Sequence, residues 1–466
     1  MTMSSIISAV AIASGVRSGD ISAVEVAEQS LDRIAAIDPR FNAFCVTLPA
    51  AALEAAKEID RRRRAGEPLG PLAGVPVAVK DFTPTAGITT TYGSMAHEHH
   101  VPDRDAVIVR RLRDAGAILV GKTTTPEFAS SWFTRSLNFG ETLNPWNPAH
   151  TCGGSSGGSA VAVATGCVPL AEGCDMLGSV RGPAAFCGVV GLKPALGRIP
   201  FDALRSTFDD ISHFGPLARS VDDAGLFLQA TSGPDRVDLN SFIPPLDLAE
   251  RSGPLKIRLS LDLGYCVVHT EVREALVRAA ENLAASGAEV REVNLDLTAE
   301  DAECVGNASM VWMAAHYGDL ADREPEKLSP LTLKMIAIGR QARAADIKYI
   351  DFVRARLWKR LSDVFEDSDV LMCPTMAQPA PLKDGDDFDF GTRDLDGRLQ
   401  ALDLTSLFNL VGACPAISVP CGMTSSGLPI GAQFIAPPHD EARVFKAAHL
   451  LERLMPFPAW TDRATF

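Results

Sequence analysis

Short apolar runs alternate with helical stretches along most of this chain, and this alternation constrains the fold more than any other feature. Val75 to Val79 is a β-branched run, and the helical pattern of Val107 to Asp114 and a buried-strand pattern at Ala117 to Val120 follow it. The same order of strand, helix and strand returns at Ile257 to Leu261, Glu271 to Ser286 and Glu289 to Leu295. Strands that alternate with helices form a sheet with helices on both faces. The sequence therefore predicts an α/β fold with a mixed central β-sheet covered by helices on both faces.

The chain has no internal repeat and no low-complexity linker, so we expect a single domain over residues 1–466. Two helices are predicted in the first 65 residues, one of them beginning at a capping box formed by Ser22 and Glu25. The expected parts are N-terminal helices at 1–65, a core with a Gly- and Ser-rich segment at 66–240, and the remainder of the α/β domain at 255–466. Within that remainder we expect a helical, substrate-side region at 304–366, a strand at Val370 to Cys373, a charged surface loop at 383–398, and strands at Ala416 to Val419 and Ile430 to Ile435.

The composition excludes several classes of protein. A formal net charge of −14 argues against nucleic acid as a partner, because phosphate binding needs a basic surface. No apolar run approaches the roughly 20 residues that span a bilayer, and no basic residue precedes the apolar patch from Ile6 to Ala13, as it would in a secretory signal. The ten cysteines include no Cys-x-x-Cys pair, which favours free thiols in a reducing compartment. We therefore expect a cytoplasmic protein that binds neither nucleic acid nor membrane.

Lys80 ends the apolar run at Val75 to Val79. Burial at such a position disfavours the charged form of an amine, and a neutral lysine can act as a general base. Most lysines at strand ends are solvated, so this residue becomes a candidate only in combination with other features.

A glycine- and serine-rich segment, Gly153 to Ser159, runs into a helical stretch rich in Ala and Val. Glycines allow unusual backbone dihedrals and the close approach of other groups. A phosphate-binding loop is the competing interpretation, but the Gly153 to Ser159 segment contains neither the Gly-Lys-Ser/Thr of a Walker loop nor G-x-G-x-x-G. A flexible linker also fits poorly, because the segment is short and lies within apolar sequence.

A third segment, Asp175 to Arg181, places Ser179 beside a glycine in a predicted turn. A serine in a tight turn can present its hydroxyl as a nucleophile while backbone N–H groups face the developing oxyanion. A Ser-His-Asp arrangement is possible in principle, and Lys80 is the candidate for a different base.

Motifs over most of the chain resemble those of the amidase signature enzymes. They are the block from Gly153 to Pro194, GVPVAVKD around Lys80, LNPWNP at 143–148, FNLVGACPAISVPCG at 408–422 and SGLPIGAQFIAPPHDE at 426–441. Lys80 and Ser155 lie 75 positions apart (155 − 80), and Ser155 and Ser179 lie 24 apart (179 − 155), which is also typical of that family. On these motifs the chain is identified as a member of the amidase signature family.

The resemblance implies the amidase signature fold and a hydrolase that cleaves the C–N bond of a small carboxamide. Ser179 would be the nucleophile, Lys80 the base, and Ser155, which in the family follows a cis peptide bond, the bridge that relays protons between them. No cofactor or metal is implied. The residues implied for the oxyanion hole and substrate binding are Ala129, Ser155, Met176, Leu177, Gly178 and Ser179, with Ser131 and Trp132 as weaker candidates. Two further residues, Asp175 and Arg181, would support the site without contacting the substrate.

Leu177 departs from the family pattern, which usually has Gly at this position. A backbone with positive φ would strain a leucine there. The side chain would either narrow the acyl-side pocket or face the core, so this residue bears on the choice of substrate.

Four functions remain open on the sequence. Besides a carboxamide, a carbamate or urea-like substrate would pass through a similar tetrahedral intermediate. A glutaminase subunit of a tRNA-dependent amidotransferase would need a partner chain, and a non-catalytic scaffold has only Leu177 in its favour. A homodimer is the assembly to test first, because dimers are the commonest soluble oligomers.

Overall fold

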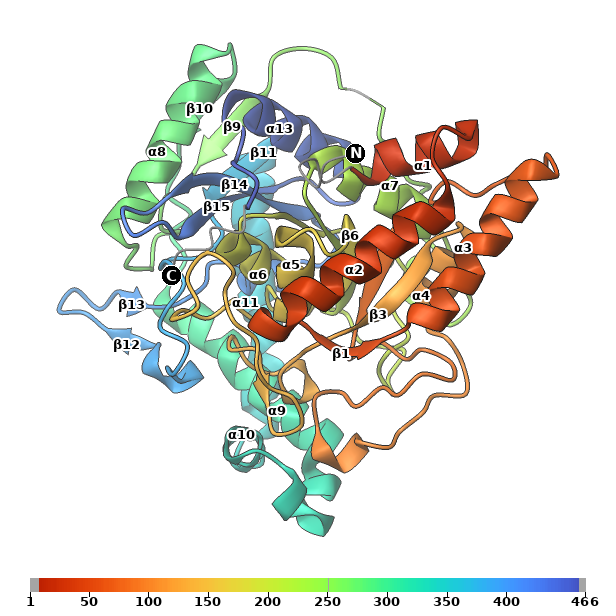
Figure 1. The fold of residues 1–466 in the computed structure, drawn as a ribbon. Coiled ribbons are helices and arrows are strands. Elements are labelled where there is room, and N and C mark those ends of the chain that lie inside the picture. The colour runs from red at the N-terminus through yellow and green to blue at the C-terminus, as the bar shows by residue number, and fades with distance from the viewer. Residues whose placement is uncertain (1–7, 250, 461–466) are drawn as a thin grey trace.

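The computed structural model describes residues 8–249 and 251–460, and it confirms the predicted α/β fold with a mixed sheet of 11 strands flanked by helices (Figure 1). Across the sheet the strands are β1 (Phe44–Thr47), β3 (Ile118–Thr123), β2 (Pro76–Lys80), β6 (Leu170–Asp175), β8 (His213–Ala218), β7 (Val190–Lys193), β14 (Ala416–Met423), β15 (Pro429–Ile435), β11 (Val370–Pro374), β9 (Lys256–Leu259) and β10 (Glu289–Glu292). Two small hairpins are β4 (Arg135–Ser136) with β5 (Gly140–Glu141), and β12 (Thr392–Arg393) with β13 (Leu399–Gln400).

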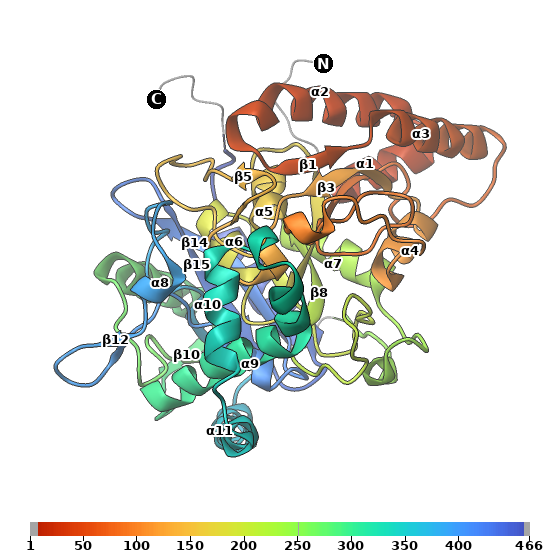
Figure 2. The ribbon, with the colours of Figure 1, turned by 90° about the horizontal axis from the view of Figure 1, so that it is seen from below.

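In chain order the helices are α1 (Ala9–Ser18), α2 (Ala23–Phe41), α3 (Pro49–Arg64), α4 (Val107–Asp114), α5 (Gly157–Ala164), α6 (Arg181–Cys187), α7 (Val221–Thr231), α8 (Thr270–Ala285), α9 (Ala299–Arg323), α10 (Pro330–Gly339), α11 (Ala344–Phe365), α12 (Leu407–Leu410) and α13 (Glu441–Leu454). The predicted helices are present, and the structure adds one helix near the N-terminus and four helices (α6, α7, α12 and α13) that the sequence pattern did not predict. Short 3₁₀ turns are η1 (Met95–His97), η2 (Glu127–Ala129), η3 (Leu239–Ser241), η4 (Pro325–Lys327) and η5 (Asp387–Asp389). The helical region predicted at 304–366 is confirmed as α9 to α11, of which α9 and α10 pack side by side (Figure 2).

The direction of the strands brings the sequence motifs to one edge of the sheet. Strands β3, β2 and β6 run parallel, and β8, β7, β14 and β15 join them by antiparallel pairs to a second parallel set of β11, β9 and β10. Parallel neighbours end at the same edge of a sheet. Lys80 at the end of β2 and Asp175 at the end of β6 therefore lie at one edge.

The prediction of two helices in the first 65 residues is wrong, because the described part of this stretch, residues 8–65, holds three helices and a strand. The αL conformation of Gly19 ends α1, and the predicted capping box of Ser22 and Glu25 begins α2. Residues Phe44–Thr47 then extend and pair with β3, and Pro49 starts α3 in its first turn. A strand of four residues whose partner is distant in sequence gives no local periodicity. Ile6 and Ile7 of the N-terminal apolar patch lie outside the described residues.

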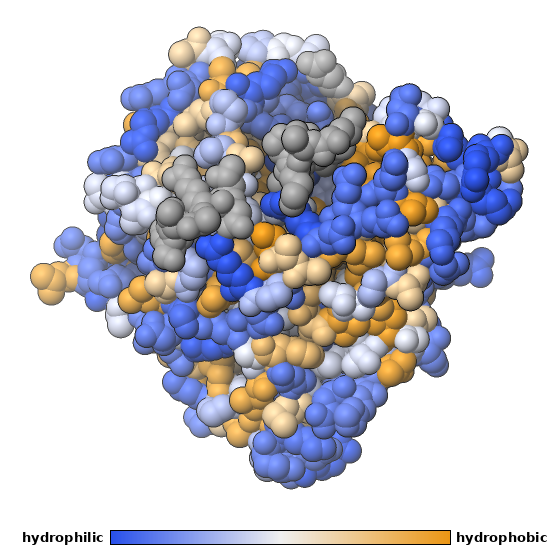
Figure 3. All heavy atoms as spheres, in the orientation of Figure 1, coloured by the Kyte–Doolittle hydropathy of each residue, from blue (hydrophilic) through white to orange (hydrophobic). Residues whose placement is uncertain are grey.

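The surface drawn in Figure 3 intersperses hydrophobic with hydrophilic residues. Among residues 8–249 and 251–460, no helix is both long and apolar enough to cross a membrane. Inside, α3 packs on β3, α13 on β14 and α6 on β15, so the apolar core follows the sheet.

A buried ion pair fixes α13 to the segment after β7. Arg198 Nε lies 2.8 Å from Glu441 Oε1, with side chains 2% and 0% exposed. Replacing Arg198 with Met leaves the Glu441 carboxylate buried without its cation, so we expect the free energy of unfolding to fall by about 3–5 kcal/mol in urea denaturation.

The matched control for this prediction is Arg278→Met. The ion pair of Arg278 with Glu274 is solvent-exposed, at 53% and 60%, and we expect a change of about 1 kcal/mol or less. Equal losses in the two variants would show that the buried pair does not contribute as we argue.

Candidate active site

Lys80 is fully buried at the end of β2, and its amine faces the glycine- and serine-rich segment. Its Nζ lies 2.7 Å from Ser155 Oγ and 3.0 Å from Ser156 Oγ, with Cys174 Sγ at 3.1 Å. The structure therefore joins two of the three residues that the sequence singles out by a direct hydrogen bond.

Ser155 lies in a tightly packed bend just before α5. The peptide bond between Gly154 and Ser155 is cis, as the family resemblance implies. A Cβ on Gly154 would lie 2.1 Å from the Ser131 carbonyl oxygen, and one on Gly158 would lie 2.6 Å from that of Ala43. Only glycine allows neighbouring backbone to approach so closely, which explains these two glycines of the motif.

Ser179 lies in the turn that connects β6 to α6. Its carbonyl oxygen accepts a hydrogen bond of 3.1 Å from the Ser156 N–H, which ties this turn to the segment that carries Ser155. Ser179 is partly exposed and lines both of the cavities described below, and Ser155 lines the smaller one. The lysine and the two serines thus meet at one site.

The Asp175 carboxylate, which is paired with Arg181, holds the Ser179 turn by hydrogen bonds to its backbone. Asp175 Oδ1 accepts from the Gly178 N–H at 2.8 Å, Asp175 Oδ2 accepts from the Val180 N–H at 3.2 Å, and both carboxylate oxygens accept from the Arg181 guanidinium. Both side chains of the pair are fully buried. Burial alone would raise the pKa of Asp175, but the adjacent Arg181 charge and hydrogen bonds hold that pKa well below its usual range.

The backbone around Ser179 leaves donors free for a ligand. Within the described residues, nothing accepts a hydrogen bond from the backbone N–H of Met176, Leu177 or Ser179. The Gly178 N–H differs, because it already donates to Asp175. The turn therefore offers three backbone N–H groups beside the Ser179 hydroxyl.

Leu177 is not in the positive-φ conformation that the family's usual glycine suggested. The positive φ, 115°, belongs to Gly178 instead, so Leu177 carries no such strain. Its carbonyl oxygen accepts from Thr405 Oγ1 at 3.0 Å. Leu177 both lines the larger cavity and packs on an apolar cluster. The two alternatives from the sequence, a pocket position and a core position, therefore both apply to this residue.

A cavity of about 310 Å³ opens beside Ser179. Its wall combines Ala129 to Trp132 with residues from the Ser179 turn, α9, the 387–391 segment and the 399–406 segment. Trp132, a weaker candidate from the sequence, lies in this wall. Tyr265 and Trp312 lie there too, although the sequence did not indicate them.

Asp387 corrects the expectation of a plain surface loop at 383–398. Its Oδ2 accepts from Ser131 Oγ at 2.6 Å, its Oδ1 accepts from the Trp132 N–H at 2.7 Å, and it lines the cavity. Burial raises the pKa of Asp387 to about 6. The acidic composition of the loop suggested solvent exposure, and no local pattern marks the carboxylate that turns inward.

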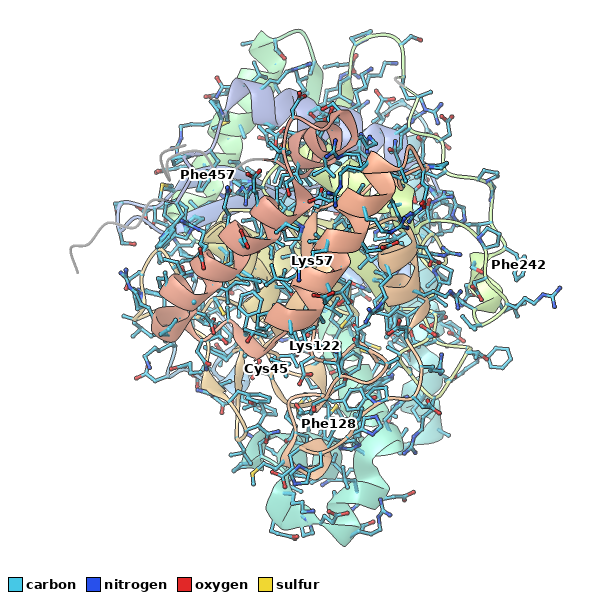
Figure 4. The ribbon with its side chains drawn as sticks, turned by 45° about the vertical axis from the view of Figure 1, so that its right-hand side comes forward. Cys45, Lys57, Lys122, Phe128, Phe242 and Phe457 are labelled. Carbon is cyan, nitrogen blue, oxygen red and sulfur yellow. The ribbon has the colours of Figure 1, made fainter. Side chains whose placement is uncertain are left out.

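A second, smaller cavity of about 30 Å³ lies on the side of Ser155. Phe82, Phe128, Phe201 and Leu204 close it, and Ala129 lines both cavities. Phe128, which is labelled in Figure 4, stacks on Tyr317 of α9 with ring centroids 3.7 Å apart and so holds η2 against that helix.

A second buried lysine, Lys122 on β3, does not belong to this group. Its Nζ donates to the Thr83 carbonyl oxygen at 2.6 Å and to Thr85 Oγ1 and Thr90 Oγ1 at 3.0 Å. Burial lowers the pKa of Lys122, but all three of its protons have acceptors in the loop after β2. Lys122 therefore fixes that loop, whereas Lys80 faces the serines.

Comparison with known proteins identifies the family of the chain. The Amidase family model matches residues 25–445. The chain belongs to the amidase signature family. Among curated relatives, a glutamyl-tRNA(Gln) amidotransferase subunit of Synechococcus sp. (strain CC9605) is 37% identical, covering 94% of each chain. The putative amidase AmiA2 of Mycobacterium bovis is 38% identical and covers 93% of this chain and 90% of its own.

Solved structures of the family have the same fold. A bacterial aryl acylamidase of the amidase signature enzymes superposes with a TM-score of 0.89 at 30% identity, covering 97% of this chain and 96% of its own. The 6-aminohexanoate cyclic dimer hydrolase superposes with a TM-score of 0.81 at 30% identity, covering 97% of each. With these relatives the chain is an amidase, a hydrolase of carbon–nitrogen bonds.

The pair of Asp175 and Arg181 gives a first prediction for the site. Asp175→Asn leaves the Arg181 charge buried without a counter-charge, so we expect the free energy of unfolding to fall by about 3–5 kcal/mol. The displaced turn should also lower kcat/KM for amide hydrolysis by about a hundredfold. Asp114→Asn, at the exposed end of α4, should change stability by about 0.5 kcal/mol or less. Wild-type stability and activity in Asp175→Asn would refute the supporting role.

Leu177 gives a second prediction. Leu177→Ala enlarges the cavity next to Ser179, so kcat/KM for a bulky amide such as 2-naphthamide should rise by about tenfold relative to propanamide. Leu395→Ala, at a fully exposed hairpin tip, should leave that ratio unchanged. An unchanged ratio in Leu177→Ala would assign this residue to packing alone.

Proposed function

We propose that the chain hydrolyses a small carboxamide through a Ser179 acyl-enzyme, with Lys80 as general base and Ser155 as the bridge between them. The observation that carries this proposal is the contact of 2.7 Å between Lys80 Nζ and Ser155 Oγ, at a cavity that Ser179 also lines. A buried amine that contacts a serine hydroxyl can accept its proton when neutral.

The proposed proton path runs from Ser179 through Ser155 to Lys80. Lys80 accepts the Ser155 proton while Ser155 accepts the Ser179 proton, and Ser179 Oγ attacks the carbonyl carbon of the amide. The tetrahedral oxyanion then accepts hydrogen bonds from the free backbone N–H groups of Met176, Leu177 and Ser179. Ser155 returns a proton to the leaving nitrogen as the C–N bond breaks, and Lys80 resupplies Ser155. Water repeats the same steps on the acyl-enzyme and releases the carboxylate.

Asp175 and Arg181 take no part in the proton transfers. Their network fixes the turn that carries the three free N–H groups before substrate arrives. Preorganised donors act without a reorganisation cost at the moment of reaction. Ala129, which lines both cavities, would contact the substrate near the scissile bond.

A glutaminase role is the second candidate. The 37% identity to a glutamyl-tRNA(Gln) amidotransferase subunit over nearly the whole chain favours it. Such a role would require a partner chain that accepts the ammonia. Carbamates and ureas remain within the same chemistry, because they form similar tetrahedral intermediates.

We place the reaction in the cytoplasm. All ten cysteines are free thiols and eight are buried, which suits a reducing compartment.

The test compares Ser179→Ala and Lys80→Ala with wild type on carboxamides, carbamates, ureas and glutamine. Each substitution should lower kcat/KM on the best substrate by at least about a hundredfold, because it removes the nucleophile or the base. Wild type should also be labelled at Ser179 by a fluorophosphonate, and Ser179→Ala should not.

Ser286→Ala is the control, because Ser286 is exposed after α8 and far from the site in sequence. Its activity should equal that of wild type. Full activity in Ser179→Ala or Lys80→Ala would refute the assignment of nucleophile or base, and labelling that survives Ser179→Ala would also refute it.

A further inference from the structure

The larger cavity has an uneven charge. Three acidic residues line it, Glu303, Asp387 and Asp403. No lysine, arginine or histidine in the described part of the chain does so. A bound acyl group therefore meets negative charge without a positive group in the same wall.

Glu303 is neutralised from outside the cavity. The Arg393 guanidinium donates to both of its oxygens, at 2.9 and 2.8 Å, and also to Glu300 at 2.8 Å. The Arg393 charge is thus shared by two carboxylates and is not available to a ligand.

Among residues 8–249 and 251–460, only neutral donors bind the carboxylates of Asp387 and Asp403. Asp387 accepts from the Ser131 hydroxyl and the Trp132 N–H. Asp403 Oδ2 accepts from the Thr405 N–H and hydroxyl at 3.0 Å and from the Ser406 N–H at 2.9 Å. Neutral donors orient a carboxylate but leave its charge uncompensated, so these two residues make the cavity electronegative.

The charged groups packed around Asp387 do not change this result. Arg135, on β4, donates to the Gly385 carbonyl oxygen at 2.8 Å, and Lys334, on α10, lies 3.5 Å from the centroid of the Phe388 ring. Neither side chain lines the cavity, and Asp386 and Asp389 on the same 3₁₀ turn add further negative charge.

Aromatic rings complete the wall. Trp132, Tyr265, Trp312, Phe388 and Phe390 all line the cavity. The faces of aromatic rings attract apolar groups and cations.

We propose that this cavity takes an apolar acyl group without negative charge, and that Asp387 gives preference to an acyl group that carries a protonated amine. The proposal rests on the proposed hydrolysis at Ser179 and names the substrate class of that site. The reaction is amide plus water to carboxylate plus ammonium, so the added amine takes no part in the chemistry. Free glutamine is a zwitterion, and the repulsion of its α-carboxylate by the electronegative wall opposes the attraction of its α-ammonium group to Asp387, so glutamine lacks the advantage expected of a purely cationic acyl group.

Three primary amides of similar size test the proposal. They are 4-(aminomethyl)benzamide, which is cationic, 4-ethylbenzamide, which is neutral, and 4-carbamoylbenzoate, which is anionic. At pH 8 we expect kcat/KM to be at least about fivefold higher for the cationic than for the neutral amide, and at least about thirtyfold lower for the anionic amide. Equal rates on the neutral and anionic amides, or faster hydrolysis of glutamine than of 4-ethylbenzamide, would overturn the proposal.

The variant Asp387→Asn distinguishes recognition of the cationic acyl group by Asp387 from a purely structural role of this residue. We expect the ratio of cationic to neutral kcat/KM to fall to about one. Asp384→Asn removes a charge from the same loop at an exposed position outside the cavity, and its ratio should match wild type. A structural role alone would lower both rates together and leave the ratio unchanged, and that result would overturn the role of Asp387.

The pH dependence of the ratio of cationic to neutral kcat/KM in the wild type tests the role of Asp387 without a variant. Because the pKa of Asp387 is raised to about 6, its carboxylate is protonated at pH 5 and ionised at pH 8. The ratio of cationic to neutral kcat/KM should therefore rise at least about threefold between pH 5 and pH 8, while the substrate amine stays protonated. A ratio that is flat with pH would overturn the role of Asp387.

Failure of the inference and failure of the proposed function have different signatures. If Ser179 is not the nucleophile, hydrolysis of all three amides survives Ser179→Ala. If only the substrate class is wrong, hydrolysis depends on Ser179 but the order of the three amides differs from the one expected.

Discussion

Asp175 and Arg181 form a fully buried ion pair whose hydrogen bonds reach both halves of the chain. Within the Ser179 turn, Asp175 accepts from the Gly178 and Val180 N–H groups. From the distant part of the chain, the Arg181 guanidinium donates to the Thr405 carbonyl oxygen, Asn409 Oδ1 and Gln433 Oε1. Two charges placed in the interior are stable only when paired and fully hydrogen-bonded. The packing of the late strands against the early ones, and the shape of the turn, therefore depend on the same few contacts.

The sequence alone predicts the fold class and the long helices well. The period of the apolar residues gives α4 at its observed bounds and α8 to within one residue at each end, because amphipathic patterning is local. The family motifs also indicate the lysine and the two serines, and the structure places Lys80 against Ser155 and Ser179 at the adjoining cavity. Residues within one short motif keep their spacing in the fold, so such predictions carry over directly.

The parts that the sequence missed are those that depend on distant partners. Strand β1 has four residues and is defined by its pairing with β3, some 75 positions later in the register. Asp387 lies in an acidic stretch that suggests solvent, and it turns inward only because Ser131 and Trp132 meet it from 256 and 255 positions away. Leu177 suggested strain at its own backbone, whereas the unusual dihedral falls on the next residue. None of these three features is encoded in a local window.

The reacting residues and the wall of the larger cavity come from different parts of the chain, and this separation bears on how such an enzyme can acquire new substrates. Lys80, Ser155, Ser179 and the supporting pair all lie before residue 182, whereas much of the 310 Å³ wall comes from residues 265–406. Changes in α9 and in the 387–403 segment can thus alter the cavity wall without replacing a residue of the reacting group or Thr405, which contacts Arg181 and the Leu177 carbonyl oxygen. Gene duplicates can acquire new substrates by drift in the second half alone. Recombination between relatives near the 240–255 connection would exchange most of that wall as a unit.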